Sequence, residues 1–265
     1  MTEVHVVREG PSPLLISVPH DGRHLPDFIE QRMTPAGRDI PDTDWHVAKL
    51  YEFVDELGAS ILIANHSRYV VDLNRPPDDA ALYEGQVATG ICPQQTFAGD
   101  DIYADGAAVV TSEQSERVHT FWQPYHSYIE AKLFSLRQEF GYALLWDAHS
   151  IPSMVPRLFD GELPVLNVGT NETKSCSVDI ADDVFKVAAS SGYESVMNDR
   201  FKGGYITRNY GEPKNNVHAI QLEIAQRAYM NETSREFDTT KAEKLTETLR
   251  SMIEAFLRSA ERNER

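Results

Sequence analysis

Residues 142–150, YALLWDAHS, join an apolar run to a polar ending, and this stretch decides the fold class. A short apolar run bounded by polar or turn residues is typical of a strand, here 142–146. Two other segments resemble it: LLISV at 14–18, followed by Pro19 and His20, and VHAIQLEIA at 217–225. The three segments predict strands of an α/β fold.

Strand-like and helix-like segments alternate along the rest of the chain, which favours the same α/β class. Residues 74–110 contain many Pro, Gly and Asp residues without periodicity, and they predict a long structured loop. Asp44 and Gly58 are expected to begin and end one helix, whereas Pro124 divides and Gly141 ends another. The further predicted strands are 60–64, 69–73 and 164–169, and the predicted helices are about 44–57, 113–140, 179–191 and 239–262.

Composition limits the classes of protein and partner. The chain has 265 residues, 41% of them hydrophobic, and no Gly/Ser-rich linker, so we expect a single domain over 1–265. Two distant cysteines, Cys92 and Cys176, and the lack of a membrane-length apolar run or signal-peptide core predict a cytoplasmic protein. A net charge of -16 disfavours nucleic acid or an anionic membrane as partner, so an anionic substrate needs a local basic site.

Polar residues at strand ends identify a candidate site. His20 and His149 follow two predicted strands, and Glu223 lies within a third. Ligand sites of open α/β sheets form at the carboxyl ends of strands, so these three residues are expected to converge. Two histidines and a carboxylate are ligand types of hydrolytic zinc sites, although the motifs HExxH and CxxC are absent. For each histidine alone, a hydrogen-bonded structural role is the alternative. Asp147, on the same strand face as His149, is expected to position that ring.

Several acidic residues lie near His20 in the sequence and leave the third ligand open. Asp21, Asp42 and Asp44 are the carboxylates in this region, and Asp44 could instead cap the following helix. Glu223 is costly inside an apolar strand unless it is paired, liganding or catalytic; an edge-strand ion pair is the alternative. Gly22 is expected to let the backbone approach a ligand closely.

Arginines near predicted loops suggest how such a chain would bind carboxylates, because the guanidinium group binds them through two hydrogen bonds. Arg68, Asn74 and Arg75 are expected to form one clamp, and Arg208, after the Gly203–Gly204 pair, a second. The alternative is internal pairing of these arginines with aspartates.

Seven segments carry a resemblance to a known family. They are SVPHDGRHLP, PDTDWHVAKLY, SRYVVDLNRPPDD, PYHSYI, LLWDAHSIPS, RFKGGYITRNYG and VHAIQLEIAQRAYM. In this order, over about residues 10–235, they resemble N-formylglutamate amidohydrolases. The resemblance implies hydrolysis of N-formyl-L-glutamate to L-glutamate and formate, a step of histidine degradation. The family is in turn similar to zinc carboxypeptidases and aspartoacylases, which implies a three-layer α/β/α sandwich around a mixed, roughly eight-stranded sheet.

The same resemblance implies roles for individual residues. The relatives carry an H-x-x-E pair, but position 23 is Arg here, so Asp44 is taken as the second ligand. Two alternatives stay open: an amidohydrolase acting on another N-acyl acidic amino acid, and a non-catalytic binder of acidic metabolites. The implied zinc ligands are His20, Asp44 and His149, the general base is Glu223, the polarising residue is Arg68, and the substrate-binding residues are Asn74, Arg75 and Arg208.

Overall fold

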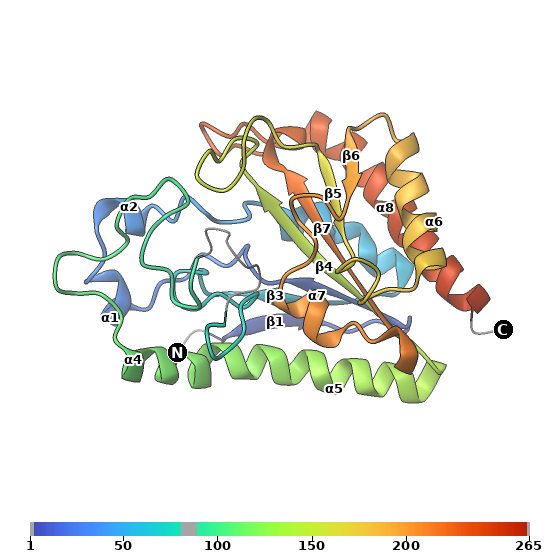
Figure 1. Ribbon diagram of the computed structural model, residues 1–265, viewed down its shortest axis with the longest axis horizontal. Coiled ribbons are helices and arrows are strands. Elements are labelled where there is room, and N and C mark those ends of the chain that lie inside the picture. The colour runs from blue at the N-terminus through green and yellow to red at the C-terminus, as the bar shows by residue number, and fades with distance from the viewer. Residues whose placement is uncertain (1–2, 81–88, 264–265) are drawn as a thin grey trace.

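The computed structural model describes residues 3–80 and 89–263, and within these ranges seven strands form one mixed sheet (Figure 1). The strand order is β1-β3-β2-β4-β7-β5-β6; β1 pairs antiparallel with β3 and β5 antiparallel with β7, whereas the other neighbours are parallel. The expected fold class is confirmed, with seven described strands where roughly eight were expected. The strands are β1 (His5–Arg8), β2 (Leu14–Val18), β3 (Ser60–Ala64), β4 (Ala143–Ile151), β5 (Leu166–Gly169), β6 (Ser195–Met197) and β7 (Val217–Ala225).

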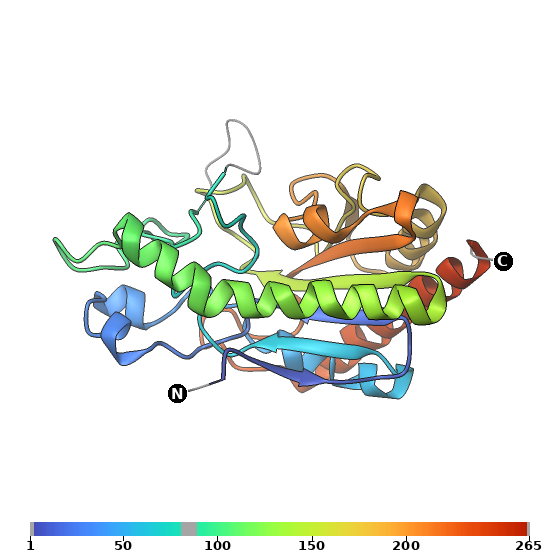
Figure 2. The same ribbon diagram turned by 90° about the horizontal axis from the view of Figure 1, so that it is seen from below.

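Helices cover both faces of the sheet, as Figures 1 and 2 show. Alternate side chains of β2 enter two separate cores, because successive residues of a strand point to opposite faces. Ile16 packs in the core that contains Leu249 of α8, whereas Leu15 packs in the core that contains Ile129 of α5. This arrangement gives the three layers. The helices are α1 (Asp27–Glu30), α2 (Pro35–Arg38), α3 (Val47–Leu50), α4 (Thr111–Arg117), α5 (Gln123–Phe140), α6 (Val178–Ser190), α7 (Tyr205–Tyr210) and α8 (Thr239–Asn263).

The strand predicted at 142–146 continues through DAHS to Ile151 as β4. Its polar residues stay in the ladder because the parallel strand β7 pairs with β4 along its whole length, with His149 opposite Glu223. Both strands are buried in full. The carboxyl ends of β2, β4 and β7 therefore lie together and present their last side chains at one edge of the sheet.

Residues 69–73 do not form the predicted strand. Val70 N donates to Ser67 O at 2.9 Å, and Arg68 Nη2 lies 2.7 Å from Asp72 Oδ2. Residues four apart in an extended strand are separated by about 13 Å, so this ion pair requires a turned backbone. The apolar alternation instead belongs to a loop buried in the core beneath α5.

The predicted helix 44–57 is divided into α3 and a 3₁₀ helix, η1 (Glu52–Leu57). Asp44 does not cap it: the carboxylate of Asp21 accepts from His46 N at 3.2 Å and Ala48 N at 2.9 Å. The predicted end at Gly58 is confirmed by its φ of 64°.

The helix predicted at 113–140 is divided near Pro124, as expected: a π segment, η2 (Val118–Trp122), separates α4 from α5, and Gly141 ends α5. In the described parts of the predicted loop, 74–80 and 89–110, there is neither helix nor strand; residues 81–88 lie outside the described ranges. The other predicted elements are confirmed within about two residues, whereas β1, β6, α1, α2 and α7 were not predicted. Within residues 3–80 and 89–263, no helix is both long and apolar enough to cross a membrane.

Three buried histidines each destabilise the fold in mild acid. Burial lowers the pKa of His66 to about 4, of His126 to about 3 and of His218 to about 4. Each of them takes up a proton near pH 6.5 in the unfolded chain but not in the folded protein, so its contribution to stability is lost as pH falls from about 6.5 toward 4. Each histidine is expected to contribute about 1–2 kcal/mol of this loss between pH 7.5 and 5.

Urea unfolding of His218→Asn at these two pH values measures the effect. The variant is expected to lose about 1–2 kcal/mol less than the wild type between pH 7.5 and 5. His119→Asn, which changes an exposed histidine on η2, is the control and is expected to behave as the wild type. Equal losses in the wild type and His218→Asn would contradict the assignment.

Candidate active site

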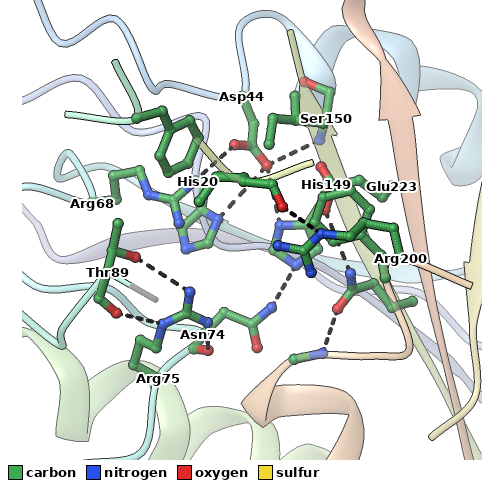
Figure 3. Close-up of a pocket in the computed structure, with 16 residues that line it drawn as sticks. His20, Asp44, Arg68, Asn74, Arg75, Thr89, His149, Ser150, Arg200 and Glu223 are labelled. Atoms are coloured by element: carbon green, nitrogen blue, oxygen red, sulfur yellow. Dashed lines mark hydrogen bonds and ion pairs between the residues drawn. The ribbon is translucent and has the colours of Figure 1, made fainter. Parts of the chain in front are cut away.

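A cavity of about 90 Å³ lies at the carboxyl ends of the central strands (Figure 3). Its lining combines a histidine and carboxylate cluster with arginines and apolar side chains. His20, His149 and Glu223 all line it, so the three residues converge as expected. The cluster consists of His20, Asp44, His149, Ser150 and Glu223; the arginines are Arg68, Arg75 and Arg200; the apolar residues are Phe97, Ile151, Leu158 and Phe201.

His20, Asp44 and His149 form a buried group whose ligand atoms all lie within 4.8 Å of one another, so this group could hold a metal ion. Asp44 Oδ2 is 3.7 Å from His20 Nδ1 and 3.1 Å from His149 Nδ1. All three residues are at most 3% exposed. Each comes from a different element: His20 follows β2, Asp44 precedes α3, and His149 belongs to β4.

Two further carboxylates orient the rings. His20 Nε2 lies 2.7 Å from Asp72 Oδ1, and His149 Nε2 lies 3.1 Å from Asp147 Oδ2. A histidine that donates through one nitrogen presents the lone pair of the other, which is the arrangement of metal-binding histidines. Within the described structure, the buried His20 Nδ1 has no hydrogen-bond partner. The donor set therefore fits a divalent cation.

The charges of these residues depend on one another, and a metal ion would bind His149 in its neutral form. Burial opposes ionisation of Asp44, but the hydrogen bond with His149 and the nearby ring of His20 outweigh it and hold its pKa below the usual value. Burial would also lower the pKa of His149, but Asp147 and Asp44 keep it well above normal. Burial raises the pKa of Glu223 to about 8. Because a nearby cation favours the charged form of a carboxylate, an ion bound to these residues would lower this pKa again.

Glu223 is not on an edge strand, because β7 lies between β4 and β5. It is 7% exposed and lies opposite His149 in the strand register, so it lines the cavity beside the group of His20, Asp44 and His149. Its nearest described hydrogen-bond partner is the amide of Gln221, at 3.5 Å from Oε2. The edge-strand ion pair is therefore excluded, and a catalytic carboxylate fits this position.

Arg68 pairs internally. Its Nη2 lies 2.7 Å from Asp72 Oδ2 and its Nη1 lies 3.6 Å from Asp44 Oδ1, with 8% of the side chain exposed. Arg68 thus keeps one positive charge beside the cluster, and Arg68, Asn74 and Arg75 line the same cavity. Arg75 points elsewhere in the lining: Nε donates to Thr89 O at 2.9 Å and Nη2 to Thr89 Oγ1 at 3.3 Å.

Comparison with known proteins assigns the chain that carries this site to a protein family. Residues 12–230 match the family described as N-formylglutamate amidohydrolase, a range that includes every residue of the cluster. The chain belongs to the N-formylglutamate amidohydrolase family.

Relatives and a solved structure of this family agree with the match. N-formylglutamate deformylase of Pseudomonas aeruginosa is 47% identical over 259 residues, which cover 97% of each chain. N-formylglutamate deformylase of Pseudomonas putida is 47% identical over 234 residues, which cover 88% of this chain and 87% of the relative. The structure of N-formylglutamate amidohydrolase from Ralstonia eutropha JMP134 has the same fold, with a TM-score of 0.79, 24% identity and 97% coverage of both chains.

Asn74 lies in the lining of the cavity and contacts the histidine cluster. Its Nδ2 donates to Asp147 Oδ2 at 3.2 Å and lies 2.9 Å from His149 Nε2, whereas its Oδ1 accepts from Ile206 N at 2.8 Å. Close packing is required here, because a Cβ added to Gly204 would lie 2.3 Å from Asn74 Nδ2. Asn74 therefore contacts protein groups at both ends of its amide.

The main chain around Asn74 is held by α5 and α7 together with the end of η2. His126 Nε2 donates to Leu73 O at 2.8 Å, and Trp122 Nε1 donates to Arg75 O at 3.0 Å. The rings of Trp122 and His126 stack with their centroids 3.6 Å apart. These contacts fix the segment that carries Asn74 and Arg75 into the site.

Three residues differ from the expectations. Arg208 is not part of the cavity lining: its Nε donates to Gly203 O at 2.7 Å, so it supports the preceding segment. Arg200 lines the cavity instead. Its closeness in sequence to the Gly203–Gly204 pair was the signal that could have identified it. Gly22 approaches protein rather than ligand, because an added Cβ would lie 2.3 Å from His66 O.

Proposed function

We propose that this protein hydrolyses N-formyl-L-glutamate to L-glutamate and formate, a reaction of histidine degradation, with a divalent metal ion, zinc, held by His20, Asp44 and His149. One observation carries this proposal: a buried set of two imidazole Nδ1 atoms and a carboxylate oxygen faces a small cavity beside a buried glutamate. The 47% identity to two proteins named N-formylglutamate deformylase supports the choice of substrate.

A divalent ion at this position supplies Lewis-acid chemistry, since it makes water more acidic and polarises a carbonyl oxygen. Imidazole and carboxylate ligands suit zinc, and three protein ligands are typical of catalytic zinc sites. Asp72 and Asp147 would orient the two histidine ligands through their Nε2 atoms.

The protein's own residues carry out the proton transfers. Glu223 accepts a proton from the water that adds to the formyl carbon, and the guanidinium of Arg68 stabilises the negative charge that develops on the formyl oxygen. The carbon–nitrogen bond then breaks as Glu223 passes the proton to the leaving nitrogen. Water is consumed, and formate and glutamate are the products.

Basic residues bind the anionic substrate in a chain whose net charge is -16. Arg75 and Arg200 line the cavity and hold one carboxylate each, which offsets the repulsion of a dianion by the acidic protein. Asn74 positions the segment that leads to Arg75.

Trp122→Phe tests the importance of that segment. The change removes the Nε1–H group that donates to Arg75 O and keeps an aromatic ring. We expect KM for N-formyl-L-glutamate to rise by about 3- to 10-fold, the effect of one lost hydrogen bond, with kcat within about twofold. Tyr128→Phe, on α5 with its hydroxyl bonded to Glu9, is the control and should leave both constants unchanged. A drop in kcat at constant KM would contradict this role.

The substrate proposal is tested by formate or acetate release from N-formyl- and N-acetyl-L-glutamate. Turnover of the formyl compound with a kcat/KM at least about 100-fold above the acetyl compound supports the proposal. Preference for the acetyl compound would indicate an amidohydrolase for another N-acyl acidic amino acid. Binding of both compounds without turnover would indicate a non-catalytic binder.

A further inference from the structure

Arg200 is a residue of the cavity lining that the sequence pattern did not identify, and it enters the site away from Arg75 (Figure 3). It follows β6, whereas Arg75 follows the buried loop that ends at Asn74. A substrate with two carboxylates presents two anionic groups at different distances from the scissile bond. The surroundings of each arginine indicate which group each one binds.

The segment that carries Arg200 is fixed on both sides. Asn198 N donates to Val168 O at 2.8 Å, and Lys202 O accepts from Asn171 N at 2.6 Å. Gly204 N donates to Gln221 Oε1 at 2.6 Å. A main chain anchored in this way gives the side chain that it carries a defined point of attachment, which a specificity-determining contact requires.

The guanidinium of Arg200 contacts a main-chain carbonyl oxygen and an aromatic ring. Its Nε donates to Leu158 O at 2.8 Å, and its central carbon lies 5.2 Å from the ring centroid of Phe201. Leu158 and Phe201 line the cavity together with Ile151. An apolar wall that ends at a guanidinium fits an arm of two methylene groups that ends in a carboxylate.

Arg75 is bordered in the cavity lining by the polar residues Thr89 and Asn74. Its donors bond to Thr89 O, Thr89 Oγ1 and Asn74 O, so its neighbourhood is polar. The carboxylate on the carbon next to the scissile nitrogen has no methylene arm and suits such a neighbourhood.

Building on the proposed function, we propose that Arg200 binds the side-chain carboxylate of the substrate and sets its selectivity for glutamate, whereas Arg75 binds the α-carboxylate. Arg200 then discriminates between substrates that differ only at the end of the side chain. N-formyl-L-glutamine is the matched probe, because it is nearly isosteric with N-formyl-L-glutamate and uncharged at that end.

The experiment measures kcat/KM for both compounds in the wild type, Arg200→Met, Arg200→Lys and Arg75→Met. In Arg200→Met we expect the ratio of glutamate to glutamine substrate to fall by about 100-fold, and Arg200→Lys to recover part of it because the charge remains. In Arg75→Met both substrates should lose a similar factor, so that the ratio stays within about threefold. Arg258→Met, at an exposed position on α8, is the control. A ratio unchanged in Arg200→Met, or lost only in Arg75→Met, would overturn the proposal.

A binding measurement separates this inference from the proposed reaction. If the wild type releases no formate, the proposed function fails, and calorimetric titration with L-glutamate and L-glutamine still tests Arg200. Arg200→Met should then weaken the binding of L-glutamate about 100-fold and the binding of L-glutamine by no more than about threefold. Equal weakening of the two ligands, or a wild type that does not prefer L-glutamate, would overturn the inference.

Discussion

Glu223→Gln is expected to lower kcat for N-formyl-L-glutamate by about 10³- to 10⁴-fold while changing KM by no more than about threefold. Glutamine has nearly the same shape as glutamate but cannot accept the proton of the attacking water or return it to the leaving nitrogen. Glu223 is buried, faces the cavity and lies opposite His149 in the register of β4 and β7, so no other described carboxylate holds an equivalent position. Steady-state formate release over a range of substrate concentrations separates the two constants.

Metal content provides the control for this variant. Glu223 lies outside the group of His20, Asp44 and His149, so Glu223→Gln should bind as much metal as the wild type. Unchanged metal content with lost turnover would support the role of a base. A kcat within about tenfold of the wild-type value would contradict it, because general acid–base catalysis contributes at least about 100-fold.

Asp44→Asn is expected to reduce bound zinc to below about 0.1 ion per chain and kcat/KM by at least about 10³-fold, since it removes the anionic ligand. The amide oxygen can still accept the hydrogen bond from Ser150 N, which Asp44 Oδ2 accepts at 3.0 Å, so the local fold should persist. Elemental analysis after dialysis against metal-free buffer gives the stoichiometry.

A neighbouring buried aspartate supplies the matched variant. Asp42 is 5% exposed, and its Oδ2 accepts from Tyr69 OH at 2.6 Å and from Phe97 N at 2.8 Å. Its carboxylate is therefore bound by residues other than His20 and His149. Asp42→Asn should retain metal. Loss of metal in Asp42→Asn but not in Asp44→Asn would show that the ligand has been assigned to the wrong aspartate.

The local sequence pattern predicted the central strands, because the apolar residues of each strand are enough to indicate that it is buried. The predicted bounds of the strands 14–18, 60–64 and 217–225 equal the observed ones. Each of these strands is an apolar run that can be recognised without knowledge of distant residues. Residues 69–73 have a similar pattern, but the ion pair of Arg68 with Asp72 and the surrounding core turn them into a loop. Short elements such as β6, three residues long, carry too little pattern to be predicted.

The candidate site was predictable where it depends on strand ends and not where it depends on loops. His20, His149 and Glu223 converge because parallel strands bring their carboxyl ends to one edge of the sheet. Arg200 was missed because its position depends on the contacts of Asn198 and Lys202 with residues about thirty positions earlier. Arg208, favoured by its neighbouring glycines, supports Gly203 instead.

Formate release from N-formyl-L-glutamate by the purified protein, before chelation, after chelation and after return of zinc, tests the central claim most directly. The account predicts that release disappears with the metal, returns when zinc is restored at about one ion per chain, and does not return in Asp44→Asn. Full activity in protein from which the metal has been removed would contradict a metal-dependent reaction at His20, Asp44 and His149.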